Sequence, residues 1–193
     1  MEQHPGLEIH PSAASALASA TFNLSPGARV SIGPGVVTER RAEGVRITVA
    51  TGGVLEIGAD TWLRSELAPV IFHVYAGAHL RVGVDGFLNG CQISAKSGVV
   101  LGRGCWVGPG SRIWDSDQHA IDETRPEESA PVHLGDHVWV AADVSVLRGV
   151  EIGSHSVIGT RSLVTRSIPA NSLAFGVPAR RHSEVGDRSQ VPI

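Results

Sequence analysis

Residues 134–164 read LGDHVWVAADVSVLRGVEIGSHSVIGTRSLV, and an aliphatic residue returns at every sixth position of this stretch. These aliphatic residues are Leu134, Val140, Val146, Ile152, Ile158 and Val164. A second column, four positions after each, holds Val138, Val144, Val150, Ser156, Ser162 and Ile168. A period of six matches neither the period of about 3.6 of a helix nor the period of about two of a single strand. It predicts an all-β fold, a β-helix of hexapeptide units in which each coil buries its inner face against its neighbours.

A related phrase, aliphatic-x-aliphatic-Gly, recurs along the chain and ends at Gly33, Gly58, Gly83, Gly102, Gly135 and Gly153. The steps between these glycines are 25, 25, 19, 33 and 18 residues. Since 18 residues are three hexads, the last step is one coil, and the step of 33 holds one coil plus an interruption of 33 − 18 = 15 residues. The longer upstream steps indicate bulges or short loops between coils. The glycines themselves predict corners at which a Cβ atom would oppose the backbone conformation.

This pattern divides the chain into three parts. Residues 1–28 carry no hexads and stay unassigned, and the Ala/Ser-rich stretch within them allows either a short helix or disorder. Residues 29–168 are expected to form the β-helix, with an inserted loop over about 114–131. Two prolines and a glycine in 169–178 end the coil pattern, so residues 169–193 are expected to cap the stack and to finish in a polar tail.

Composition narrows the possible classes of function. The formal net charge of −3 argues against a nucleic-acid partner. No run approaches the ~18 apolar residues of a membrane helix, so no membrane insertion is expected. The N-terminus lacks the pattern of a secretory signal, and we expect a cytoplasmic location. Cys91 and Cys105 are then expected to be free, buried thiols in a reducing compartment.

The interruption of the repeat is the place to look for chemistry, because rigid scaffolds carry functional residues on the loops they hold. It begins after Ile113 and contains Asp115-Ser116-Asp117-Gln118-His119. Imidazole can accept and return a proton near neutral pH, and a nearby carboxylate can orient the ring. The alternative interpretation is a surface loop with an incidental histidine, and composition alone does not decide between the two.

The chain resembles the left-handed β-helix O-acetyltransferases in five features. These are the hexads, the histidine loop, the stretch Val138–Ala142, the stretch Ile158–Arg166 and the Gly176–Ala179 ending. That family includes galactoside and maltose acetyltransferases and polysaccharide O-acetyltransferases. The resemblance spans about residues 29–182. It implies a left-handed β-helix, a homotrimer with sites between subunits, acetyl-CoA as co-substrate without a metal, and a sugar, glycan or polysaccharide precursor as acceptor.

The resemblance also assigns residues. His119 matches the family's general base and Asn89 the asparagine beside the acceptor, while Asp115 and Asp117 are candidate supports for the histidine. The coenzyme-binding positions of the family fall on Trp139, Ala141, Ala142, Gly159, Thr160, Thr165, Arg166 and Arg180. The backbone amide of Ala142 would polarise the thioester carbonyl, a role that needs no side chain. Two departures are visible, since Ala141 stands where the family usually has Gly and Arg166 where it usually has Lys.

Two other functions compete with acetyl transfer. One is a β-helix metalloenzyme of the γ-carbonic anhydrase type, with histidines from two subunits around one metal. Two pairs of histidines have spacings that are multiples of six, so each pair is expected to stack in one column. The pairs are His137 with His155, 18 residues apart, and His73 with His79, six residues apart. Each column is expected to be an outward-facing ladder of side chains and not a metal site, because a zinc site needs three or four converging ligands. The other is a non-catalytic β-helix used for assembly.

Overall fold

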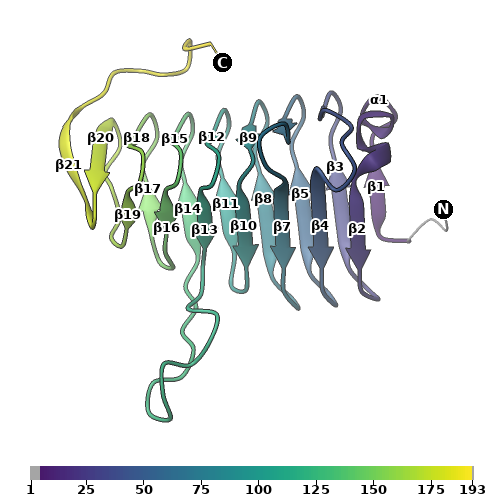
Figure 1. Cartoon of the computed structure of the whole chain (residues 1–193), viewed down its shortest axis with the longest axis horizontal. Helices are drawn as coiled ribbons and strands as arrows, with labels where there is room; N and C mark the ends of the chain where they lie inside the picture. Colours follow the sequence, from purple (N-terminus) through teal and green to yellow (C-terminus); the bar gives the residue numbers. More distant parts are fainter. Residues whose placement is uncertain (1–4, 193) are drawn as a thin grey trace.

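The computed structural model describes residues 5–192, which form a triangular prism with three seven-stranded sheets as its faces (Figure 1). Sheet A contains β1 (Leu7–Ile9), β3 (Arg29–Ile32), β5 (Val54–Ile57), β8 (His79–Val82), β11 (Val99–Leu101), β14 (Val132–Leu134) and β17 (Glu151–Ile152). Sheet B contains β2 (Thr21–Leu24), β4 (Val45–Val49), β7 (Val70–Val74), β10 (Gln92–Ala95), β13 (Arg112–Trp114), β16 (Ser145–Val146) and β19 (Leu163–Val164). Sheet C contains β6 (Trp62–Arg64), β9 (Phe87–Asn89), β12 (Trp106–Val107), β15 (Trp139–Val140), β18 (Val157–Ile158), β20 (Ser172–Gly176) and β21 (Ala179–Glu184).

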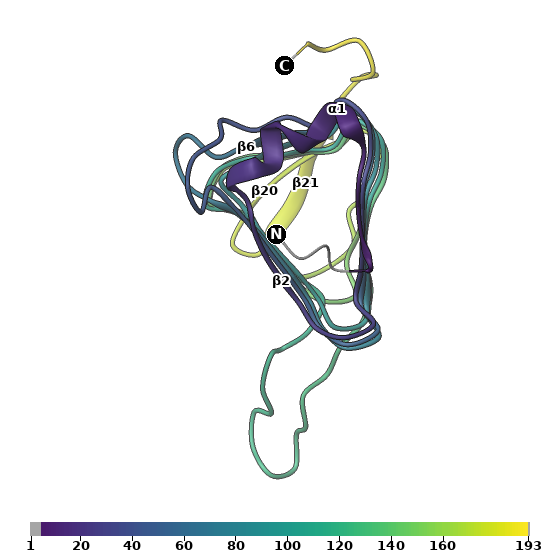
Figure 2. The same cartoon turned by 90° about the vertical axis from the view of Figure 1, so that its right-hand side faces the viewer.

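Each coil runs from sheet A to sheet C, then to sheet B, and then back to sheet A in the next coil. Seen end-on, the coils superimpose as a triangle (Figure 2). We call the corner between sheets C and B the pocket corner, and the corner between sheets B and A the loop corner. Residues 115–131 leave the prism at the loop corner, between β13 and β14, as a long projecting segment.

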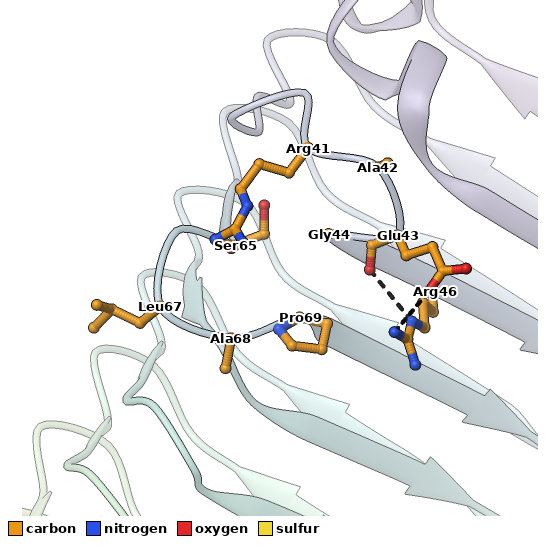
Figure 3. A pocket seen from close by; sticks show the side chains of 9 residues that line it. All are labelled: Arg41, Ala42, Glu43, Gly44, Arg46, Ser65, Leu67, Ala68 and Pro69. Carbon is orange, nitrogen blue, oxygen red and sulfur yellow. Dashed lines mark hydrogen bonds and ion pairs between the residues drawn. The ribbon is translucent and has the colours of Figure 1, made fainter.

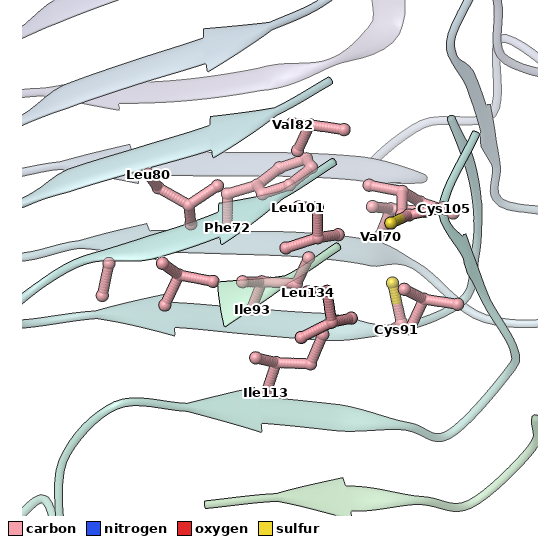
Figure 4. Close-up of a cluster of buried hydrophobic side chains, with 14 of the residues drawn as sticks. Val70, Phe72, Leu80, Val82, Cys91, Ile93, Leu101, Cys105, Ile113 and Leu134 are labelled. Carbon is pink, nitrogen blue, oxygen red and sulfur yellow. The ribbon is translucent and has the colours of Figure 1, made fainter. Parts of the chain in front are cut away.

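The core consists of the predicted columns. All six aliphatic residues of the first column have no exposed surface, and no residue of the second column is more than 6% exposed. The interior is therefore a continuous apolar stack, which Figure 4 shows around Phe72, Leu80 and Ile113. This arrangement confirms the β-helix predicted from the period of six, because every sixth residue points inward at the middle of one face.

The repeat glycines have a different role from the one predicted. A Cβ on Gly58 would lie 2.6 Å from the carbonyl carbon of Gly83, and one on Gly83 would lie 2.6 Å from that of Gly102. These glycines are thus required by the close approach of stacked coils. The left-handed backbone falls two residues later, at positions such as Asp60 and His137, where φ is 55° and 56°.

The β-helix begins earlier than residue 29, contrary to the predicted boundary. β1 pairs with β3 and β2 pairs with β4, and the short helical segments α1 (Pro11–Ala14) and η1 (Ala16–Ser19) take the place of a strand of sheet C. Leu17 is buried there, 3% exposed, and covers the end of the core. A first coil has only one neighbour and therefore needs no strict hexads. Residues 1–4 lie outside the described part.

The other end of the stack carries a hairpin. β20 continues sheet C in parallel with β18, and β21 then pairs with β20 in antiparallel orientation. The chain thereby covers the terminal coil, and residues 185–192 run back along the prism (Figure 1). In the described part of the chain, no helix is long and apolar enough to cross a membrane.

Part of the residues in excess of 18 per coil lie at two corners, and the others lengthen the upstream strands, since β7 has five residues and β16 has two. The two upstream steps of 25 contain the segments 38–44 and 65–69, both at the pocket corner, and the step of 33 contains 115–131 at the loop corner. The irregularities of the repeat therefore lie on either side of sheet B.

Candidate active site

Asp115 fixes the root of the projecting loop. Its carboxylate is fully buried and accepts hydrogen bonds from the backbone amides of Lys96 (2.8 and 3.0 Å), Ser97 (2.6 Å) and Gly98 (2.6 Å), which form the turn between β10 and β11. The Asp115 carbonyl also accepts from the amide of Ala130, at 2.9 Å. One carboxylate thus ties the outgoing strand of the loop to the preceding coil.

Asp117 is exposed and has a different partner. Arg148 Nε donates to its Oδ1 at 2.8 Å, and this hydrogen bond holds the pKa of Asp117 below its usual range. The same guanidinium reaches Glu128 at 2.7 Å, while the Asp117 amide donates to the Glu128 carbonyl at 3.0 Å. Arg148 therefore clamps both strands of the loop near its base.

Gln118 completes the root. Its Oε1 accepts from the Tyr75 hydroxyl at 3.0 Å, and its Nε2 donates to Ser116 Oγ at 2.6 Å. Lys96 donates to the Gln118 carbonyl at 3.3 Å, pairs with Glu127 at 2.6 Å, and lies 4.6 Å from the centre of the Tyr75 ring. Neither Lys96 nor Tyr75 lies in a motif that marks it as part of this network, although Lys96 is the only lysine in the chain.

His119 follows this network directly and is exposed. Its ring makes no hydrogen bond or ion pair with any other residue in the range 5–192. The prediction that Asp115 or Asp117 supports the ring is not met in this structure, because both carboxylates are committed to the root of the loop. Both carboxylates instead hold the backbone just before His119.

Asn89 lies at the pocket corner. It ends β9 and is 7% exposed, and its Oδ1 is buried without a hydrogen-bond partner among the described residues. Its register partner on β6 is Arg64, whose Nε is also buried without a partner in the described chain. Orphaned polar atoms of this kind are rare in folded proteins and mark places where an outside group completes the hydrogen bonding.

A ladder of backbone hydrogen bonds extends along the pocket corner from Asn89 toward the C-terminal coils. Gly90 donates to Arg64, Gly110 to Gly90, Asp143 to Pro109 and Arg161 to Ala142, at distances between 2.9 and 3.0 Å. Ala141, Ala142, Gly159 and Thr160 all lie on this corner. The Ala142 amide donates to no other residue of the described part, so it is available as a donor to a substrate oxygen.

The remaining predicted coenzyme residues lie elsewhere. Thr165 and Arg166 are exposed at the loop corner, and Arg180 is exposed on β21, opposite Phe175. Trp139 is 39% exposed on the outer face of sheet C. Its indole lies edge-on to Trp106, with 6.3 Å between ring centres, and the Arg188 guanidinium lies 5.3 Å from its ring centre. Arg188 was not identified from the sequence, because its tail carries no repeat to place it.

Within one chain most of the predicted site residues therefore form two separate groups, and Trp139 and Arg180 belong to neither. His119, Thr165 and Arg166 occupy the loop corner, whereas Asn89, Ala142 and the residues beside it occupy the pocket corner. Sheet B separates the two groups.

The cysteines show no sign of activation. Cys91 and Cys105 are free and buried, as predicted, and burial raises the pKa of each thiol to about 12. Nucleophilic attack needs the thiolate, which these two residues hold in negligible amount at neutral pH.

His137 and His155 stack with ring centres 5.3 Å apart, as predicted for residues one coil apart. The prediction was wrong for His73 and His79, which lie on different sheets because six residues are a third of a coil. Over residues 5–192, no group of three or more His, Cys, Asp and Glu residues is arranged to hold a metal ion.

These features define a class of protein, a parallel β-helix that presents an exposed histidine on a braced loop. A family model described as bacterial transferase hexapeptide (six repeats) matches residues 131–166. An inferred acetyltransferase of Schizosaccharomyces pombe, C18B11.09c, is 31% identical over 164 residues, which cover 82% of this chain and 74% of that protein. Galactoside O-acetyltransferase of Escherichia coli is 29% identical over 138 residues, 69% of this chain and 66% of the relative.

Solved structures agree on the fold. The polySia-specific acetyltransferase NeuO matches with a TM-score of 0.68 and 20% identity, over 96% of this chain and 83% of NeuO. Galactoside acetyltransferase in complex with coenzyme A matches with a TM-score of 0.50 and 23% identity, over 94% of this chain and 76% of that chain. The chain belongs to the hexapeptide-repeat acetyltransferases, and its fold is their left-handed β-helix.

Proposed function

We propose that this protein transfers the acetyl group of acetyl-CoA to a hydroxyl of a sugar, glycan or polysaccharide precursor, with His119 as general base. His119 takes the proton of the acceptor hydroxyl as its oxygen bonds to the thioester carbon. The Ala142 amide donates to the oxyanion that forms. Collapse of this intermediate breaks the carbon–sulfur bond, and the coenzyme thiolate takes the proton back from the imidazolium. The products are an acetyl ester and coenzyme A.

The observation that carries this proposal is the exposed His119 on a loop whose root is tied down by Asp115, Arg148 and Lys96. A general base is effective when its backbone is held in place while its ring remains free to meet the substrate. The raised pKa of both cysteines also supports direct transfer in a ternary complex over an acyl-enzyme. The direct test mixes acetyl-CoA, the purified protein and a panel of sugars, and measures the release of the coenzyme thiol.

The sugar acceptor is supported by the names of the relatives. One acts on galactosides and one solved neighbour is specific for polySia. The chain covers only 66% of the length of the Escherichia coli enzyme, so the acceptor is inferred for this chain and not transferred from that one. We also infer a cytoplasmic location, supported by the two unpaired thiols, and a single β-helix domain. Its hexad-bearing part, residues 29–168, is preceded by the coil that contains β1 and β2 and is closed by the C-terminal hairpin.

Arg166 and Arg180 are expected to bind the anionic groups of the coenzyme, as the family resemblance implies. Replacing either with Ala should raise the KM for acetyl-CoA about ten- to hundredfold, because a hydrogen bond to a charged group contributes roughly 1.5–3 kcal/mol. The KM for the acceptor should stay nearly constant. Arg29 offers a matched control, since it is an exposed arginine on β3, far along the β-helix from Arg166 and Arg180. An unchanged coenzyme KM in both variants would remove these residues from the site.

We further propose a homotrimer in which each active site lies between two subunits. Its support is the separation of His119 and Asn89 on two corners of one chain. In a cyclic trimer with sheet B facing the axis, the loop corner of one subunit meets the pocket corner of the next. Each of the three sites then takes His119 from one chain and the Ala142 amide from its neighbour.

Mixed trimers test this shared site. His119→Ala subunits and subunits with a blocked pocket corner, Asn89→Trp, should each be inactive alone. Unfolded together and refolded as mixed trimers, they should regain activity, because some interfaces combine the two intact corners. Sedimentation should give a single trimeric species throughout. A fully active monomer, or mixtures that stay inactive although mixed trimers form, would contradict the arrangement.

A further inference from the structure

The two long segments at the pocket corner enclose a cavity. Residues 38–44 and 65–69 replace the two-residue connection found between β9 and β10, and they rise beside one another (Figure 3). The cavity between them is about 190 Å³ in volume. It is lined by Arg41, Ala42, Glu43, Gly44, Arg46, Ser65, Leu67, Ala68 and Pro69. The C-terminal coils close this corner with four residues, 108–111 and 141–144, so the segment 38–44 is three residues longer and 65–69 is one residue longer.

The walls of the cavity are tied together. Arg41 Nη1 donates to the carbonyl of Ser65 at 3.1 Å and also to the carbonyl of Glu66. Glu39 accepts from the Ser65 amide at 2.6 Å and from Trp62 Nε1 at 2.9 Å. Partial burial opposes the ionisation of Glu39, but these hydrogen bonds outweigh it and hold the pKa of Glu39 below its ordinary value. The two segments therefore form a braced enclosure.

The residues that line the cavity include two arginines, Arg41 and Arg46, and one carboxylate, Glu43. Arg46 pairs with Glu43 at 2.8 Å, and Arg64 behind the wall pairs with Glu66 at 2.6 Å. Arg41 donates only to carbonyl oxygens and pairs with no carboxylate in the described part of the chain. Arg41 is thus the arginine of the lining that forms no ion pair within residues 5–192, and a guanidinium is a planar fork suited to a carboxylate or phosphate.

The cavity lies beside the segment that follows Asn89. Ala68 lines this cavity and also a second one of about 160 Å³, which Gly90, Cys91 and Gly110 border further along the corner. A Cβ on Gly90 would lie 2.9 Å from the Cβ of Ala68, so the wall of the first cavity touches the backbone that follows Asn89. The orphaned atoms of Asn89 and Arg64 lie on the neighbouring strands. The two cavities therefore follow one another along the pocket corner, beside the strand that carries Asn89.

We propose that this cavity is the acceptor subsite, and that Arg41 makes it selective for a sugar carrying one negative charge. The inference rests on the proposed acetyl transfer and adds to it the class of acceptor. The anionic group would be a carboxylate or a phosphate on the sugar ring. The hydroxyl to be acetylated would then extend toward Asn89 and the histidine of the neighbouring subunit.

The test compares three acceptors that differ in charge. Methyl α-D-galactoside is neutral, methyl α-D-galacturonoside carries a carboxylate, and α-D-galactose 1-phosphate carries a phosphate. We expect kcat/KM for at least one anionic sugar to exceed that for the neutral sugar about tenfold or more. The anionic sugar with the higher kcat/KM shows whether the cavity prefers a carboxylate or a phosphate. Arg41→Gln should reduce this preference to less than about twofold without changing the KM for acetyl-CoA. Arg41→Lys should retain most of it, because the charge remains.

Arg81→Gln is the control, an exposed arginine on sheet A outside the cavity. The charge preference also distinguishes two roles of Arg41, recognition of the anionic group and bracing of the enclosure. If Arg41→Gln only loosened the enclosure, kcat/KM would fall by the same factor for all three acceptors. If none of the three is turned over, saturation-transfer NMR must show an anionic sugar bound to the wild type and not to Arg41→Gln. Absence of that binding, equal use of neutral and anionic sugars, or a preference that survives Arg41→Gln overturns the inference. Failure of the proposed function would differ, because acetyl-CoA itself would neither bind nor be consumed.

Discussion

His119→Ala is expected to lower kcat by about 10² to 10⁴, the usual contribution of a positioned general base. An alcohol is a poor nucleophile at neutral pH, so attack on a thioester requires that its proton be removed as the bond forms. The ring of His119 is exposed and makes no polar contact within the described chain, so its loss leaves the network at the root of the loop intact. Thermal stability and acetyl-CoA affinity should therefore match those of the wild type.

The control is His133→Ala, an exposed histidine on β14 immediately after the loop. This variant should retain wild-type turnover, which excludes a general effect of removing imidazole. Steady-state kinetics with saturating acetyl-CoA measure both variants. Near wild-type turnover by His119→Ala would refute its role as the base, and a burst of coenzyme A in the absence of acceptor would indicate an acyl-enzyme instead.

Asp115→Ala is expected to be the most destabilising single change in the loop. The buried carboxylate accepts from three successive backbone amides, and its removal leaves all three without a partner inside the fold. Loss of a buried charged partner of this kind costs about 3–5 kcal/mol. In a domain of this size such a loss lowers Tm by roughly 6–20 °C. Differential scanning calorimetry measures it, and limited proteolysis should show faster cleavage within 115–131.

Asp117→Asn provides the comparison two residues away. Asp117 is exposed and its ion pair with Arg148 is open to solvent, so its loss should change Tm far less than the loss of Asp115. Activity should fall in both Asp115→Ala and Asp117→Asn, because a displaced loop carries His119 away from its position. The pH dependence of the remaining activity should be unchanged. A shifted pH profile in Asp117→Asn would show that this carboxylate contacts His119 during turnover.

The histidine loop shows which features of the site could be predicted from the sequence. The interruption of the repeat correctly indicated where the chain leaves the β-helix, because an insertion cannot fit into a stack of 18-residue coils. The Asp-Ser-Asp-Gln-His phrase suggested a carboxylate beside the ring, which the structure does not show. Adjacent residues in a loop point in directions set by their partners, and those partners, Arg148 and the amides of residues 96–98, are distant in sequence.

The sequence by itself determined the β-helix and the inward-facing columns, because a period of six can be satisfied only when three faces repeat around one axis. It also indicated the interruption and both buried cysteines. Only the tertiary structure decided that the repeat glycines serve the close stacking of coils, that the helix starts before residue 29, and that His119 and Asn89 occupy different corners. It alone placed the two upstream irregularities side by side as an enclosure around Arg41. Periodicity reports the direction of each side chain relative to its own coil, whereas a site depends on which coils and corners become neighbours in space.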